Sequence, residues 1–145
     1  MTTDAADPTS PRSFVLLKPD AVRRGLVGAV LGRFEAKGLR IVALELRQVD
    51  AELADQHYAE HVDKAFYPPL RTFVTSGPSV AMIVEGDEVI DVVRAINGAT
   101  DGRKAAPGTI RGDYSLSNRE NLVHGSDSPE SAAREISLWF PHLAG

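Results

Sequence analysis

Short apolar runs constrain the fold of this chain more than any other feature. Residues 13–18 and 78–85 are almost wholly apolar, and a shorter run covers residues 122–124. Runs of this length are typical of strands covered on both faces. Residues 39–49 are also strand-like, and within them Leu44 and Leu46 alternate with Glu45 and Arg47. We therefore predict a sheet of four strands.

Amphipathic segments separate these strands and predict helices. The segments share apolar side chains at helical spacing and residues that begin or end helices, such as an N-cap, an early proline or a C-terminal glycine. The resulting order is β-α-β-α-α-β-α-loop-β-α, which reduces to βαββαβ, a ferredoxin-like sandwich of class α+β with a four-stranded antiparallel sheet and helices packed on it. The helices are expected from Val27 to Gly38, from Asp50 through His57, Tyr58 and His61, from Pro68 to Ser76-Gly77, from Val89 to Asn97-Gly98, and from Ser128-Pro129 to Phe140.

Length and composition indicate one domain. A chain of 145 residues normally forms one core, which we place at residues 13–145, with residues 1–12 as a flexible arm. The net charge of −4 argues against a general nucleic-acid or anionic-membrane surface. No apolar run could span a bilayer and no signal peptide is visible, so we expect a cytoplasmic protein. The absence of cysteine excludes disulfide and thiolate chemistry.

The segment Asn121-Leu122-Val123-His124-Gly125-Ser126-Asp127-Ser128 holds the strongest candidate for catalysis. A histidine at a strand end is more often a satisfied polar residue than a catalyst. Here glycine lets a ligand approach the backbone, and hydroxyl and carboxylate groups follow. An imidazole that attacks phosphorus must be neutral and needs a partner for its other nitrogen, which Glu135 on the next helix could be. We predict that His124 is a nucleophile for a phosphoryl group.

Three further histidines compete with His124. His142 lies in the C-terminal tail, where solvation is the simplest interpretation. His57-Tyr58-Ala59-Glu60-His61 matches the H-x-x-E-H zinc-protease pattern. No third ligand is obvious on a following helix and the chain is small for a protease, so we prefer a partly exposed helix face.

Residues 98–112 carry no periodic pattern but are rich in glycine, threonine and basic residues. Glycines allow main-chain amides to approach an anion, and arginine forks match phosphate oxygens. An ordinary solvated loop is the alternative interpretation, and it suits Arg103 and Lys104 better than it suits Arg111. Lys18 ends an apolar run, where a charged side chain is unusual and suggests a functional contact, although it could also reach solvent. No P-loop or dinucleotide fingerprint is present.

An ordered set of motifs resembles the nucleoside diphosphate kinase family from about Phe14 to Phe140. Each motif is weak alone, but the set, with His-Gly-Ser-Asp-Ser, is specific. The motifs are Lys18-Pro19-Asp20-Ala21, Arg24-Gly25-Leu26-Val27-Gly28, His57-Tyr58, Ser76-Gly77-Pro78, residues 107–113 (PGTIRGD), residues 121–128 and residues 135–140 (EISLWF).

The resemblance implies a ping-pong reaction that maintains the pools of ribo- and deoxyribonucleoside triphosphates. His124 would take the γ-phosphate of a nucleoside triphosphate, mainly ATP, on its δ nitrogen and pass it to a nucleoside diphosphate. Glu135, steadied by Ser126, would hold the other ring nitrogen. The remaining roles implied are Lys18, Tyr58 and Asn121 for ribose hydroxyls and the transferred phosphate, Phe66 and Leu70 for the base, Arg94 and Thr100 for the β-phosphate, Arg111 for the γ-phosphate, and Asp127 near a magnesium ion that arrives with the nucleotide.

The resemblance also implies a homo-oligomer, for which we expect a hexamer with a tetramer as the rival. Residues 101–106 depart from the family's usual sequence, and their glycine is expected to loosen a loop that helps to build the oligomer. The alternative function is a non-catalytic nucleotide-binding or regulatory module of the same fold. RNA binding is disfavoured, because the strands lack paired exposed aromatic residues.

Overall fold

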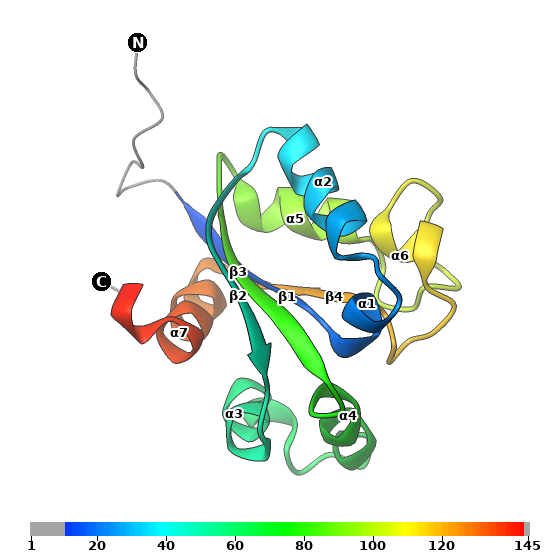
Figure 1. Ribbon diagram of the computed structural model, residues 1–145, viewed down its shortest axis with the longest axis vertical. Helices are drawn as coiled ribbons and strands as arrows, with labels where there is room; N and C mark the ends of the chain where they lie inside the picture. The colour runs from blue at the N-terminus through cyan, green and yellow to red at the C-terminus, as the bar shows by residue number, and fades with distance from the viewer. Residues whose placement is uncertain (1–10, 144–145) are drawn as a thin grey trace.

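The four strands form one antiparallel sheet with the order β2-β3-β1-β4 (Figure 1). The computed structural model describes residues 11–143, so residues 1–10 of the expected arm lie outside the described residues. The expected bound of the arm at residue 12 is wrong, because Arg12 begins strand β1 and pairs with Glu85 of β3. This sheet and the helices packed on it confirm the α+β, ferredoxin-like fold. The strands are β1 (Arg12–Leu17), β2 (Arg40–Gln48), β3 (Pro78–Glu85) and β4 (Val123–Gly125).

The helices begin and end largely where local sequence signals place them. The side chain of Asp50 accepts a hydrogen bond from Leu53 N, and that of Ser128 accepts one from Ser131 N, as N-caps do. Gly38 ends a helix in the left-handed conformation (φ 102°) that glycine adopts without a steric penalty. The helices are α1 (Pro19–Arg23), α2 (Val27–Lys37), α3 (Ala51–His57), α4 (Tyr67–Val74), α5 (Val89–Asn97), α6 (Ile110–Tyr114) and α7 (Pro129–Trp139), with 3₁₀ turns η1 (Ala59–His61) and η2 (Pro141–Leu143).

Helices cover both faces of the sheet, which explains why the central strands are so apolar. In Figure 1, α2 and α5 lie on one side of the sheet, and α3, α4 and α7 lie on the other. Val15 and Leu17 of β1 pack into the hydrophobic core on the side of α2 and α5. Phe14 and Leu16 pack into the core on the side of α3, α4 and α7. The alternation follows from the two-residue period of a strand. No helix among residues 11–143 is long and apolar enough to cross a membrane.

Four local details differ from the sequence prediction. Helices α1 and α6, of five residues each, were not predicted, because such short helices depend on surrounding contacts rather than on periodicity. Helix α3 ends at His57, and His61 lies in the separate turn η1. Strand β4 lies one residue further along the chain than expected.

The connection into β4 is fixed by the residues that follow β1. Leu122 adopts a left-handed conformation (φ 74°), which is unusual for a residue with a side chain. Its N–H donates to Asp20 Oδ2 (3.1 Å), and its carbonyl accepts from Lys18 N (2.8 Å). Asp20 is 1% exposed, and burial raises the pKa of its carboxyl. These contacts bring the end of β1 and the start of β4 to one point, where the candidate site lies.

Candidate active site

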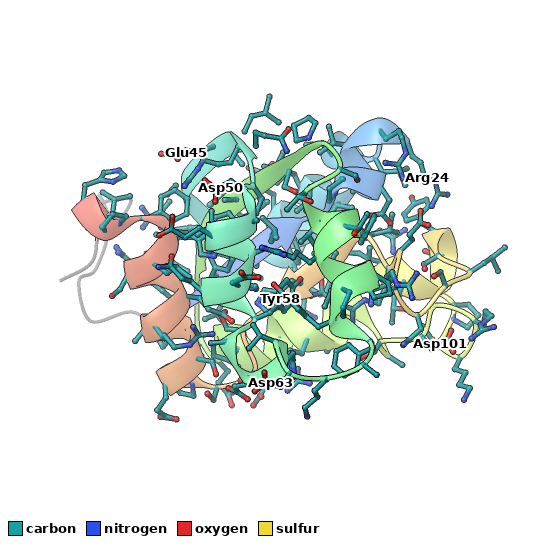
Figure 2. The ribbon with its side chains drawn as sticks, turned by 90° about the horizontal axis from the view of Figure 1, so that it is seen from below. Arg24, Glu45, Asp50, Tyr58, Asp63 and Asp101 are labelled. Carbon is teal, nitrogen blue, oxygen red and sulfur yellow. The ribbon has the colours of Figure 1, made fainter. Side chains whose placement is uncertain are left out.

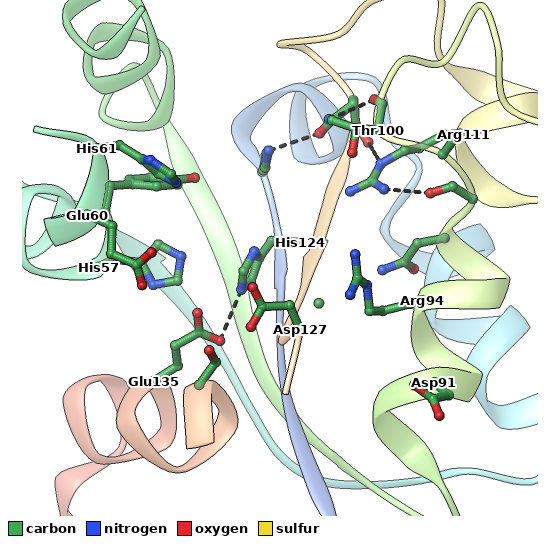
Figure 3. A pocket seen from close by; sticks show the side chains of 18 of the residues that line it. His57, Glu60, His61, Asp91, Arg94, Thr100, Arg111, His124, Asp127 and Glu135 are labelled. Atoms are coloured by element: carbon green, nitrogen blue, oxygen red, sulfur yellow. Dashed lines mark hydrogen bonds and ion pairs between the residues drawn. The ribbon is translucent and has the colours of Figure 1, made fainter. Parts of the chain in front are cut away.

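His124 occupies the middle of β4, opposite Leu16 of β1, and its side chain is 22% exposed. Its Nε2 lies 3.1 Å from Glu135 Oε1, and Ser126 Oγ donates to the same oxygen (2.7 Å). A carboxylate only accepts hydrogen bonds, so Nε2 of His124 carries a proton, and in the neutral imidazole Nδ1 keeps the lone pair. The structure thus brings the predicted trio of His124, Glu135 and Ser126 together. It leaves Nδ1 as the ring nitrogen not held by Glu135 (Figure 3).

His124 lines a pocket of about 710 Å³. Lys18, Arg94 and Arg111, the cationic residues predicted to contact the nucleotide, line it too. Lys18 Nζ donates to Asn121 Oδ1 (2.9 Å). Burial, together with the charge of Arg111, lowers the pKa of Lys18 to about 8, although Asp20 opposes the shift. Asn121 is itself held, because its Nδ2 donates to the carbonyl of Thr100 (3.0 Å). Lys18 is therefore a desolvated cation in a fixed position.

Arg111 donates to three backbone carbonyls from two segments of the chain at the rim of this pocket. Its Nε donates to the Asn121 carbonyl (3.2 Å), its Nη1 to the Gly98 carbonyl (2.8 Å) and its Nη2 to the Val123 carbonyl. Burial and the neighbouring Arg94 lower the pKa of Arg111 to about 10. A guanidinium has five N–H donors, so two remain for a ligand.

Arg94 and Asp127 both line the pocket and lie near each other (Figure 3). Arg94 belongs to α5, and Asp127 precedes the N-terminus of α7. A hydrogen bond from Ser131 and the charge of Arg94 lower the pKa of Asp127. Thr100 lies on the same rim as Arg94, so the residues predicted for the phosphates surround one space.

A second pocket of about 520 Å³ adjoins the first and contains the predicted base-binding residues. Phe66, half exposed, and Leu70 line it. Leu116, which is 85% exposed, lines it too and was missed by the sequence analysis. A lone leucine in a polar segment (Tyr-Ser-Leu-Ser-Asn) is the signal that could have found it. Both pockets share the side chains of Lys18, Tyr58, His61, Thr100 and Asn121.

Tyr58 lies between α3 and α4, on the side of the molecule that Figure 2 shows. Its hydroxyl is buried and has no hydrogen-bond partner among the described residues. Burial raises the pKa of this phenol, and the nearby Tyr67 and Glu135 add to the rise. The hydroxyl therefore stays protonated at neutral pH and can donate to a bound anion.

The prediction of a partly exposed helix face at His57 and His61 is wrong for His57, which is 4% exposed. The side chains that the described residues bring together as possible metal ligands are His57, His124 and Glu135. Glu60 and His61 of the H-x-x-E-H pattern are not part of this group. The helix ends at His57, and the ring of His57 turns toward His124 (ring centroids 4.8 Å apart).

The loop around Asp101 is fixed by hydrogen bonding and close packing at Gly102. Gly102 N donates to the Ser117 carbonyl (3.0 Å), and a Cβ on Gly102 would come within 2.3 Å of the Ser115 carbonyl oxygen. Gly102 is thus needed for close packing. The expectation that it loosens the loop is wrong.

Comparisons with known proteins agree with this geometry. The family model for nucleoside diphosphate kinase matches residues 11–144. A nucleoside diphosphate kinase of a Nocardioides species is 76% identical over 134 residues, which cover 92% of this chain and 99% of that protein. One from Saccharopolyspora erythraea is 62% identical over 135 residues, with 92% and 99% covered.

A solved structure agrees as well. The halophilic nucleoside diphosphate kinase of Halobacterium salinarum in complex with CDP has a TM-score of 0.88 and 50% identity, and the match covers 90% of this chain and 88% of that one. The matches span nearly the whole chain and include its fold. The chain therefore belongs to the nucleoside diphosphate kinase family, and it is a nucleotide-binding phosphotransferase of that type.

Proposed function

We propose that this chain transfers the γ-phosphate of a nucleoside triphosphate, mainly ATP, to nucleoside diphosphates through a phosphohistidine at His124. The observation that carries the proposal is the trio at β4. Glu135 holds the protonated Nε2, so the Nδ1 lone pair of His124 stays available at a pocket lined by cationic side chains. A neutral imidazole with one oriented nitrogen is what nucleophilic attack on phosphorus requires.

The reaction balances in two mirrored halves. In the first half, Nδ1 of His124 forms a bond to the γ-phosphorus, the bond from that phosphorus to the β–γ bridging oxygen breaks, and the nucleoside diphosphate leaves with the electron pair. In the second half, a β-phosphate oxygen of another nucleoside diphosphate attacks the phosphohistidine and restores His124. The phosphohistidine formed from one nucleoside triphosphate can be discharged to a different nucleoside diphosphate. The enzyme would in this way maintain the pools of ribo- and deoxyribonucleoside triphosphates.

The phosphates would bind where donors and positive charge gather. Arg94 and Thr100 would hold the β-phosphate, and the two free N–H groups of Arg111 would reach the γ-phosphate. Lys18 would donate to the transferred phosphate, and so would the hydroxyl of Tyr58, which has no hydrogen-bond partner within residues 11–143. Donors held in a partly desolvated pocket stabilise developing charge without reorganising, which favours transfer.

The sugar and base would extend into the second pocket. Asn121 and Lys18 lie where both pockets meet and would contact the ribose hydroxyls. Phe66 would stack on the base, with Leu70 and Leu116 beside it. Every base offers an aromatic face, so stacking of this kind tolerates different bases.

Magnesium would enter with the nucleotide and neutralise phosphate charge when bound. The residues present fit this ion. Asp127 supplies one exposed carboxylate beside the phosphate-binding rim, and Mg²⁺ in such sites uses one or two carboxylates, substrate phosphates and several waters. Asp127 would then bind the ion through its water shell.

We also propose a homo-oligomer, a hexamer in preference to a tetramer, working in the cytoplasm among its nucleotide substrates. The edge strand β2 supports association, because Leu44 is 52% exposed and Leu46 is 68% exposed on it. Exposed apolar residues on an edge strand favour pairing with another chain.

Labelling with γ-labelled ATP tests the function. We expect a covalent label that survives alkali but not acid, and its loss together with nucleotide exchange in His124→Ala. His142→Ala, at an exposed histidine in η2, is the matched control and should label normally. An unlabelled wild-type protein that still binds nucleotide would support the non-catalytic module instead.

A further inference from the structure

The described residues bring His57, His124 and Glu135 together, with one possible ligand atom of each within 4.8 Å of the others. Two imidazoles and a carboxylate are a common ligand set for Zn²⁺. A transition-metal ion bound among them would compete for the Nε2 contact between His124 and Glu135. The cluster therefore has the composition of a metal site at a position where a metal would disturb the nucleophile.

The indole of Trp139 changes what His57 can offer to a metal. Its Nε1 donates to His57 Nδ1 over 3.1 Å, and an indole N–H can only donate. A neutral imidazole has one ring lone pair, so in His57 that pair lies on Nδ1, toward Trp139, and Nε2 carries the proton. Neither ring nitrogen of His57 is then free to bind a metal ion.

Protonation does not relieve this arrangement, because His57 is buried. Burial lowers the pKa of His57 well below its usual value, and the nearby His124, Arg134, Lys18 and His61 lower it further. The hydrogen bond that Nδ1 accepts from Trp139 leaves no place for a second proton, so His57 is neutral with its proton on Nε2.

The indole is held too firmly to release the bond. Trp139 is 2% exposed and stacks on Phe14, with ring centroids 5.0 Å apart at 29°. The guanidinium of Arg47 lies 5.4 Å from the centre of the indole, and its Nη1 donates to the Trp139 carbonyl (2.8 Å). The backbone and the ring of Trp139 are thus fixed together.

The two neighbouring histidines consequently share one tautomer but present opposite sides. Both carry their proton on Nε2. In His124 the Nε2 proton is donated to Glu135, and the Nδ1 lone pair remains available to the pocket. In His57 the Nδ1 lone pair accepts the hydrogen bond from Trp139. Residues that fix the tautomer of a histidine strongly influence its affinity for metals.

We propose that Trp139, by occupying the lone pair of His57, keeps Zn²⁺ and similar transition-metal ions out of the cluster of His57, His124 and Glu135. His124 is then the imidazole of this cluster whose lone pair remains available. The benefit to catalysis rests on the proposed function of His124, but the exclusion of metal does not.

Substitution of Trp139 tests the proposal on nucleotide-free protein. Trp139→Phe keeps an aromatic ring against Phe14 but removes the N–H, so His57 can move its proton to Nδ1 and offer Nε2. Zn²⁺ affinity, measured by competition with a chromophoric chelator, should rise by roughly 10- to 100-fold over wild type. Adding His57→Gln should abolish the gain, whereas adding His61→Gln, in η1, should preserve it.

Nitrogen NMR of the wild-type imidazoles provides a second test that needs no variant. We expect the His57 proton on Nε2, and in Trp139→Phe a shift of that proton toward Nδ1. A wild-type proton on Nδ1, or Zn²⁺ binding that Trp139→Phe leaves unchanged, would overturn the proposal. Both measurements omit nucleotide, so they remain informative even if His124 proves not to be phosphorylated.

Discussion

The contact between Glu135 and His124 makes a prediction about rate. Glu135 Oε1 accepts from His124 Nε2 at 3.1 Å and from Ser126 Oγ at 2.7 Å, and its side chain is 6% exposed. Glu135→Ala removes the group that keeps the lone pair on Nδ1. Hydrogen bonds to charged groups contribute about 1.5–3 kcal/mol, which corresponds to a loss of roughly 10- to 150-fold in the phosphorylation rate of His124.

Single-turnover phosphorylation by ATP, followed in a rapid-quench apparatus, measures this rate directly. Glu130→Ala is the matched control, because Glu130 is an exposed carboxylate in the first turn of the same helix, α7. The control should stay close to the wild-type rate. A Glu135→Ala protein that remains folded and is phosphorylated as fast as the control would refute the orienting role.

Two further predictions concern the loop at Gly102 and the charge of Lys18. Gly102→Ala should lower the free energy of unfolding by about 1–3 kcal/mol in urea denaturation, because its Cβ would meet the Ser115 carbonyl, whereas Gly28→Ala, with open space around it, should not destabilise the fold. Burial lowers the pKa of Lys18 to about 8, so the amine loses its charge as the pH rises through that value. Affinity for ADP, measured by calorimetry, should therefore fall above about pH 8, well before an ordinary lysine would titrate; a constant affinity up to about pH 9.5 would contradict this.

The strands and most helices could be predicted because their signals are local. The apolar run at residues 78–85 and the caps at Asp50, Gly38 and Ser128 each act within a few residues. The short helices α1 and α6 could not be found this way, because five residues form too few helical hydrogen bonds to be stable without tertiary contacts.

The candidate site was identified through the ordered motifs more than through any single residue. His124, Glu135 and Ser126 lie close together along the chain, and their proximity could be anticipated. The position of Leu116 in the second pocket depends on how a long loop folds back, and a lone leucine carries little information about that.

The sequence by itself determined the strands of the sheet, the helix boundaries with clear caps, the family and the candidate site residues. Periodicity, caps and motif order can all be recognised in the sequence alone. The tertiary structure decided which histidine keeps a usable lone pair. The sequence context singled out His124 as the catalytic candidate, but the ring nitrogen that keeps the lone pair depends on Trp139 for His57 and on Glu135 for His124. A hydrogen bond between residues 82 positions apart has no local signature, because it exists only after the sheet and α7 have come together.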